Sequence, residues 1–113
     1  MINASDMPIK FEFSADEDTK RLFEIAVYFL ERYFGYGQDE AVKLVNYYYN
    51  QRENKHDDDY YHHEGAFHVA VQIHYFIYLE KDIDHFPEWK LDHNLINTPR
   101  EAIDYFHEHY YVR

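Results

Sequence analysis

The segment from Lys20 to Phe34 constrains the fold more than any other part of the chain. Its apolar positions cover most of the circumference of a helix, whereas the charged positions Lys20, Glu24 and Glu31 fall on one narrow stripe. The apolar positions are Leu22, Phe23, Ile25, Ala26, Val27, Phe29, Leu30, Tyr33 and Phe34. A helix that is apolar on nearly every side needs other elements around it, because water would otherwise meet its apolar faces. We therefore expect this helix in the middle of a hydrophobic core.

Capping residues and periodicity divide the chain into four predicted helices, at about residues 16–34, 38–54, 59–80 and 98–110. Ser14 and Asp16 offer N-caps for the first helix. Gly35 and Gly37 end it, because glycine tolerates positive φ.

The last predicted helix has the clearest start. Thr98, Pro99 and Glu101 predict an N-cap, a first-turn proline and a capping-box acid. Before it, residues 81–97 break the helical period and contain Pro87, so we expect a long loop there, with at most one helical turn.

Each of the other predicted helices carries an apolar stripe at helical spacing, as expected of helices that cover a central one. The stripes are Ala41/Val42, Val45 and Tyr48/Tyr49 in the second helix, Ala66, Val69/Ala70, Ile73 and Phe76/Ile77 in the third, and Ile103, Phe106 and Tyr110 in the fourth. The sequence therefore predicts an all-α, compact four-helix bundle-like domain that spans residues 1–113.

The N-terminal arm, residues 1–14, has two interpretations. Residues Ile9–Phe13 alternate apolar and polar, which is the period of a half-buried strand. A strand alone is marginal. The segment is therefore either a short strand, which could pair with a second copy in a homodimer, or an extended arm packed on the helices.

Charge is the most unusual feature of the composition. The chain has 22 Asp and Glu residues against 11 Lys and Arg residues, a net charge of −11. A phosphate backbone repels such a chain, which argues against direct nucleic-acid binding. The same field accelerates association with a basic protein. The alternative is that acidity only keeps a tyrosine-rich surface in solution.

Several function classes lack the residues they need. Cysteine is absent, which excludes disulfides and a cysteine nucleophile, and serine occurs only at Ser5 and Ser14. With three glycines, no phosphate-binding loop is predicted. The first residues carry no secretory signal and no apolar run approaches a membrane span, so we expect a cytoplasmic protein without a membrane partner.

A cluster of candidate metal ligands in residues 56–68 is the basis of an alternative function. The candidates are His62, His63, Glu64 and His68, of which the last two are four residues apart and would share one face of a continuous helix. They would serve a metal-binding bundle or a metal-dependent hydrolase. The cluster contains no H-E-x-x-H, and the predicted third helix contains no Glu-x-x-His. We therefore prefer the interpretation that these residues cap and line a helix surface, and we expect no cofactor.

Acidic and aromatic residues are concentrated in the second half of the chain. Residues 56–113 carry a net charge of −8, and the first 55 residues carry −3. Tyrosine and tryptophan anchor protein interfaces, and acids around them steer a basic partner. The predicted partner-binding residues are Asp57, Asp58, Asp59, Tyr60, Tyr61, Glu64, Asp82, Asp84, Trp89 and Asp92.

The preferred function is a small acidic inhibitor of the antitoxin, immunity or anti-defence type. It would neutralise a basic protein such as a toxin or a nucleic-acid-binding enzyme, so the chain is a binding protein rather than an enzyme. A scaffold or homo-oligomer whose aromatic surface is its own interface is the third hypothesis.

Nine histidines make this charge sensitive to pH. Protonating all of them would change the net charge from −11 to −2, so we expect partner binding to weaken between about pH 7 and pH 5. His74 shares a face with Phe67, Val71 and Tyr78, which predicts a half-buried, hydrogen-bonded imidazole.

Overall fold

The structure is a computed structural model that describes residues 9–51, 61–62 and 64–111. Its central element is α1 (Glu17–Phe34), which begins and ends where the sequence predicts. The Asp16 carboxylate accepts a hydrogen bond from the Thr19 N–H at 2.8 Å and so caps the first turn. At the other end, Gly35 adopts φ +79°, and its N–H donates to the Glu31 carbonyl at 3.2 Å.

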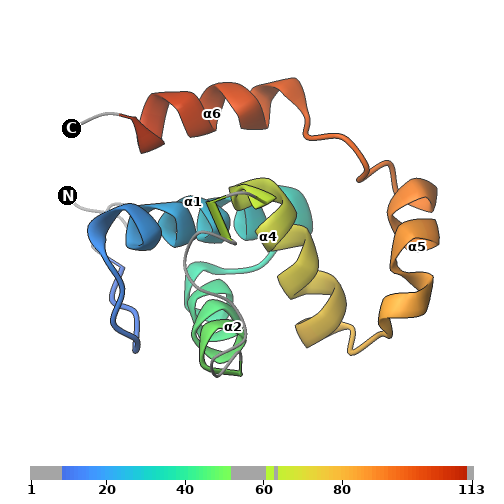
Figure 1. Ribbon diagram of the computed structural model, residues 1–113, viewed down its shortest axis with the longest axis horizontal. Helices are drawn as coiled ribbons and strands as arrows, with labels where there is room; N and C mark the ends of the chain where they lie inside the picture. The colour runs from blue at the N-terminus through green and yellow to red at the C-terminus, as the bar shows by residue number, and fades with distance from the viewer. Residues whose placement is uncertain (1–8, 52–60, 63, 112–113) are drawn as a thin grey trace.

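Neighbours surround α1 on most of its circumference. Figure 1 shows it in the middle of the fold, with α6 (Arg100–Tyr110) on one side and α2 (Gln38–Gln51) and α4 (Ala66–Gln72) on the other. It packs against all three helices. Its fully buried side chains are Leu22, Phe23, Ala26, Val27 and Leu30. The prediction that this helix occupies the centre of the core is therefore confirmed.

The apolar stripes predicted for α2 and α4 face this core. In α6 the side that faces the core differs from the predicted one. Ala41, Val45 and Tyr48 are buried in α2, as are Ala66, Val69 and Ala70 in α4. In α6 the buried residue is Ala102, while Ile103 is 40% exposed, so its predicted inward position is wrong. One residue further along a helix is about 100° further around it, which turns Ile103 away from α1 when Ala102 points inward.

The N-terminal arm forms no strand in the described residues, and its backbone bends at Glu12 and Phe13. The Phe13 ring stacks on Tyr49 of α2 with centroids 4.0 Å apart, and it meets Phe23 of α1 edge-on at 5.7 Å. The Glu12 N–H donates to the Asn46 side-chain oxygen at 2.8 Å. A side chain of α2 thus satisfies a backbone group that a paired strand would have satisfied, and the alternative of a packed arm is the correct one.

Gly65 interrupts the helix predicted over 59–80. Tyr61, His62 and Glu64 have helical backbone, but Gly65 has φ +87° and ψ 154° before α4 begins at Ala66. Only glycine adopts this conformation without strain, so the break is specified by the residue type. The prediction of one continuous helix is therefore wrong at this position.

After α4 the chain continues as a π-helix, η2 (Ile73–Tyr78). The Leu79 N–H donates to the His74 carbonyl five residues earlier, at 3.0 Å. The Tyr75 side chain is completely buried, and its hydroxyl donates to the Asp82 carbonyl at 2.7 Å. This bond holds the segment that follows against η2.

The loop predicted over 81–97 contains a helix. A short 3₁₀ turn, η3 (Ile83–His85), leads directly into α5 (Phe86–Asp92), with Pro87 in its first turn, where proline is tolerated. The Phe86 and Trp89 rings lie 4.7 and 4.9 Å from the Tyr75 ring, which ties α5 to η2. The loop prediction is wrong because two helical turns are too short to give a clear apolar period.

The capping box predicted for α6 is also wrong. Pro99 occupies the position before the helix, and no side chain caps the first turn. The Thr98 hydroxyl bonds His68 Nε2 at 3.3 Å, and the Glu101 carboxylate accepts from Arg32 at 3.3 Å. Both predicted capping groups are thus engaged by other elements.

The chain is all-α and bundle-like, as the sequence predicts. Within the part that the structure describes there are five α-helices rather than the four expected, because of α5. None of the described helices has the length and apolar character that a membrane crossing requires.

We expect Phe23→Ala to destabilise the protein by about 3–5 kcal/mol, because it leaves a cavity where α1, α2 and the arm meet. The Phe23 ring lies within 6.5 Å of five other rings, those of Phe11, Phe13, Tyr48, Tyr49 and Tyr61. Urea unfolding measures the effect. The control is Tyr47→Ala, at a side chain that is 54% exposed, which we expect to change the free energy of unfolding by less than about 0.5 kcal/mol. Similar losses for both variants would contradict this assignment of the core.

Candidate functional site

The residues predicted to bind a partner do not form one surface. Asp57, Asp58, Asp59 and Tyr60 lie outside the described residues. Tyr61 is 2% exposed and packs edge-on against Phe23, so it belongs to the core, which corrects its assignment to a surface interface.

The candidate metal ligands that the structure describes are held apart by separate hydrogen bonds; His63 lies outside the described residues. His62 bonds the Thr19 hydroxyl through Nε2 at 3.1 Å and the Tyr110 hydroxyl through Nδ1 at 2.9 Å. Both of its nitrogens therefore link helices, and His62 is half-buried, so the expectation that it lines a helix surface is wrong.

Glu64 accepts from the Gln72 amide at 3.1 Å, and His68 bonds Thr98 instead. The break at Gly65 means that Glu64 and His68 do not lie on one continuous helix. Among the described residues, no three His, Asp or Glu side chains come close enough together to hold a metal ion.

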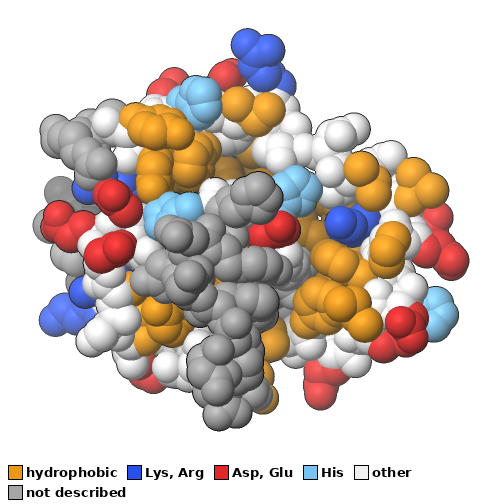
Figure 2. Space-filling view, in the orientation of Figure 1, with side chains coloured by type: hydrophobic (Ala, Val, Ile, Leu, Met, Phe, Trp, Pro, Cys, Tyr) orange, Lys and Arg blue, Asp and Glu red, His pale blue; other side chains and the backbone are white. Residues whose placement is uncertain are grey.

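Predicted residues Asp82, Asp84 and Asp92 are exposed and flank two apolar side chains that the sequence analysis did not select. Ile83 is 71% exposed and Leu91 is 66% exposed. We define the α5 surface as these two apolar residues with the acids around them, namely Asp82, Ile83, Asp84, Glu88, Leu91 and Asp92. Figure 2 shows hydrophobic and acidic side chains next to one another on this part of the molecule, at the right of the view.

Helical spacing places the residues of the α5 surface on the outer side of η3 and α5. Asp84, Glu88 and Leu91 follow one another at intervals of four and three residues, which is one face of a helix. The opposite face carries Phe86 and Trp89, which pack on Tyr75.

Two further contacts concern residues on α5. Predicted residue Trp89 is half-buried in this packing, so it supports the segment rather than standing free as an anchor. The Lys90 ammonium lies 4.6 Å from the centre of the Phe86 ring, which directs the one lysine of α5 along the helix toward that ring. The outer side of α5 is therefore left to the acids and Leu91.

His85 and Asp82 form a pair at the edge of the α5 surface. The imidazole Nδ1 lies 2.8 Å from one carboxylate oxygen of Asp82. This hydrogen bond, and then the carboxylate charge, raise the pKa of His85, while the same hydrogen bond lowers the pKa of Asp82.

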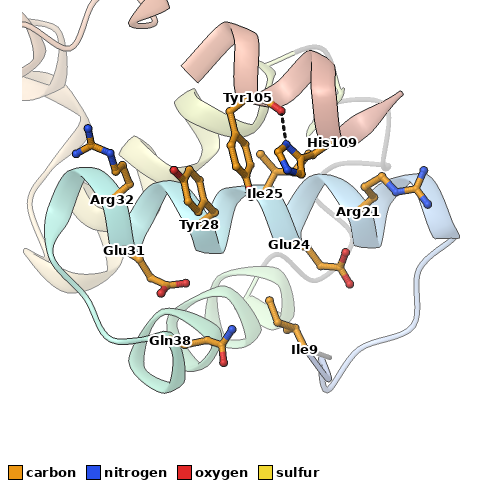
Figure 3. A pocket seen from close by; sticks show the side chains of 10 residues that line it. All are labelled: Ile9, Arg21, Glu24, Ile25, Tyr28, Glu31, Arg32, Gln38, Tyr105 and His109. Atoms are coloured by element: carbon orange, nitrogen blue, oxygen red, sulfur yellow. Dashed lines mark hydrogen bonds between the residues drawn. The ribbon is translucent and has the colours of Figure 1, made fainter. Parts of the chain in front are cut away.

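A second feature is a groove of about 490 Å³ between α1, the end of α6, the start of α2 and the arm (Figure 3). Its walls include Ile9, Ile25, Tyr28, Gln38 and Tyr105. The Tyr28 and Tyr105 rings stack in parallel, with centroids 3.8 Å apart. We call this the α1–α6 groove.

Two glutamates of α1 line the groove without a neutralising partner. The carboxylates of Glu24 and Glu31 form no hydrogen bond or ion pair with a described side chain, and the two neighbouring arginines bond other groups. Arg21 donates to the Tyr110 carbonyl at 3.3 Å, and Arg32 bonds Glu101 at 3.3 Å.

Burial raises the pKa of both groove glutamates. The positive charges of Arg21 and Lys20 act in the opposite direction on Glu24, but more weakly than burial. The sequence analysis placed Glu24 and Glu31 on one stripe of α1 without assigning them a role. Two charged residues on one side of an otherwise apolar helix were the sequence feature that could have predicted an open side of α1.

Comparison with protein-family models, with curated proteins and with solved structures gives no match.

Two half-buried imidazoles make the fold sensitive to acid. His74 bonds the Tyr36 hydroxyl through Nδ1 at 2.5 Å and stacks on Phe34 at 4.3 Å, as predicted for a half-buried, hydrogen-bonded histidine. Burial lowers the pKa of His74 below its ordinary 6.5, and the nearby His93 lowers it further. Burial also lowers the pKa of His68, with a smaller effect of Lys90 in the same direction and an opposing one of Glu64.

We expect the free energy of unfolding to decrease as the pH falls below about 6.5, because the unfolded chain then binds protons that the folded chain does not. Urea unfolding at about pH 7.5 and pH 5.5 measures this. His68→Gln and His74→Gln should each show a smaller decrease than the wild type. His107→Gln, at an exposed position, is the control and should behave like the wild type. An unchanged pH dependence in all three variants would rule out these two imidazoles as the cause.

Proposed function

We propose that the protein is a small acidic binding protein that captures a basic protein partner through the α5 surface. The observation that carries the proposal is the exposure of Ile83 and Leu91, 71% and 66%, among four acids. These are the two most exposed large apolar side chains in the part of the chain that the structure describes. Apolar groups with a polar rim are typical of protein contact surfaces.

The chemistry of the α5 surface selects the kind of partner. Apolar side chains supply affinity once a partner excludes water from them, and the surrounding carboxylates favour a partner with lysine or arginine at the rim. Residues 80–97 contain five acids against two lysines, and the Lys90 ammonium lies close to the Phe86 ring. The net charge of −11 extends this preference over long range.

Neutralising a basic toxin or a nucleic-acid-binding enzyme, as an antitoxin, immunity or anti-defence protein does, is the activity that such a surface supports best. We place this interaction in the cytoplasm, a reducing compartment with which a chain without cysteine is compatible. The metal-dependent alternative gains no support from the described residues, since His62, Glu64 and His68 each bond a different partner.

Capture from a lysate of the source cells tests the proposal, with the wild type and two variants immobilised side by side. Ile83→Ser with Leu91→Ser removes the apolar contacts, while Asp84→Asn, Glu88→Gln and Asp92→Asn remove the charge. We expect a basic protein to be retained by the wild type and lost by both variants. Retention should fall as salt is raised toward 0.5 M, roughly, because salt screens exposed charges.

Ile103→Ser is the matched control, because it removes an exposed aliphatic side chain on α6, outside the α5 surface. It should retain the partner. If every variant retains the same proteins, or if retention is indifferent to salt, the α5 surface does not bind a basic partner. A second copy of the chain could cover this face instead, and sedimentation of the wild type tests for such a dimer. If the wild type is a dimer and the Ile83 and Leu91 substitutions dissociate it, a second copy covers the α5 surface.

The affinity for the captured partner should decrease between about pH 7 and pH 5.5, because histidine protonation adds positive charge to the α5 surface. The raised pKa of His85 means that it gains its proton early in this interval. His85→Gln should therefore lose less affinity than the wild type over the same interval, measured at constant ionic strength. His107→Gln is the control on α6. Equal losses in the wild type and in His85→Gln would show that His85 does not weaken the attraction.

A further inference from the structure

The α1–α6 groove presents two carboxylates at a defined separation. Glu24 and Glu31 are seven residues apart on α1, which corresponds to about 10 Å along the helix axis. Seven residues are close to two full turns, so both side chains leave the helix on nearly the same side. Figure 3 shows both pointing away from α6, toward the side of the groove where Ile9 and Gln38 lie.

No described cation forms an ion pair with either carboxylate, although the charges of Arg21 and Lys20 act on Glu24 more weakly than burial does. Figure 3 shows Arg21 and Arg32 at the two ends of the groove, with their guanidinium groups turned away from the glutamates. Their hydrogen bonds to the Tyr110 carbonyl and to Glu101 account for that orientation. The groove therefore presents two carboxylates, an exposed one at Glu24 and a half-buried one at Glu31, to which no described side chain bonds.

The wall beside the two carboxylates suits a hydrocarbon chain. Ile25 and Ile9 are aliphatic, and the stacked Tyr28 and Tyr105 rings lie between the two glutamates along α1 (Figure 3). Methylene groups pack against such side chains, and tyrosine rings also attract ammonium groups. The volume of about 490 Å³ lies within the range of small-molecule sites.

We infer that the α1–α6 groove binds a linear aliphatic polyamine, with one ammonium group on Glu24, another on Glu31 and the carbon chain along the wall between them. A single metal ion does not fit, because its ligands must approach to about 2–2.6 Å and the two glutamates leave α1 at points about 10 Å apart along its axis. This inference is independent of the proposed function, which uses the α5 surface.

Titration calorimetry at low salt tests the inference with diaminooctane as the probe, because its extended chain spans the distance between the two carboxylates. Octylamine, which has the same chain and one ammonium group, is the ligand control. We expect diaminooctane to bind about tenfold more tightly than octylamine. Glu24→Gln and Glu31→Gln should each weaken diaminooctane binding about fivefold, which is the size of one exposed ion pair.

The matched protein control is Glu108→Gln, which removes one exposed carboxylate from α6 outside the groove and should leave diaminooctane binding unchanged. Glutamine has nearly the same shape as glutamate, and circular dichroism verifies that each variant is folded. The double variant Glu24→Gln with Glu31→Gln should bind the diamine and octylamine equally.

Three results would overturn the inference. In the first, diaminooctane binds no more tightly than octylamine. In the second, neither glutamine substitution weakens the binding of diaminooctane. In the third, a lysine-rich peptide displaces diaminooctane, binds with higher affinity than diaminooctane does, and requires the same two glutamates. The groove would then be a peptide site. The α5 variant Ile83→Ser with Leu91→Ser should bind diaminooctane normally, so failure of partner capture and failure of this inference are distinguishable.

Discussion

The burial of α1 on most of its circumference is the constraint from which the rest of the structure follows. An isolated helix of this composition would expose Leu22, Phe23, Val27 and Leu30 to water, so every other element packs on it or on its neighbours. Each covering helix needs only one apolar face, and its other face can carry charge. Glu24 and Glu31 of α1 lie on the side of that helix where the α1–α6 groove is open.

The histidines lie in two kinds of surroundings, so acid has two separate effects, one on the stability of the fold and one on the charge of the surface. His62, His68 and His74 bond threonine or tyrosine hydroxyls on other elements, and burial lowers the pKa of the latter two. His85 lies outside, beside Asp82, and its pKa is raised instead. His68 and His74 therefore affect the stability of the fold as the pH falls, whereas His85 changes the charge that a partner meets.

The sequence predicts the fold where a local interaction has no competitor. Asp16 and Gly35 limit α1 as expected, because no other element engages the Asp16 carboxylate or needs another conformation at Gly35. The prediction for α6 is wrong since His68 and Arg32, distant in sequence, take the Thr98 and Glu101 side chains. Of the residues in the α5 surface, Asp82, Asp84 and Asp92 can be predicted from the charge of the sequence alone. Tertiary packing decides that Ile83 and Leu91 are exposed. It also brings α1, α6 and the arm together at the groove. The spacing of apolar residues along the sequence predicts neither result.

The uncompensated glutamates distinguish a site from ordinary surface charge. Burial raises the pKa of Glu24 and Glu31, so their ionised forms are less favourable in the folded chain than in the unfolded one, and at neutral pH they reduce the stability of the fold. Repulsion within a chain of net charge −11 acts in the same direction. Folding alone would be served better by glutamine at both positions, or by arginines turned toward them. Arg21 and Arg32 are close enough to line the same groove and are directed elsewhere. A cation from outside the chain would relieve this effect, and the spacing of the two glutamates along α1 favours one with two charged ends.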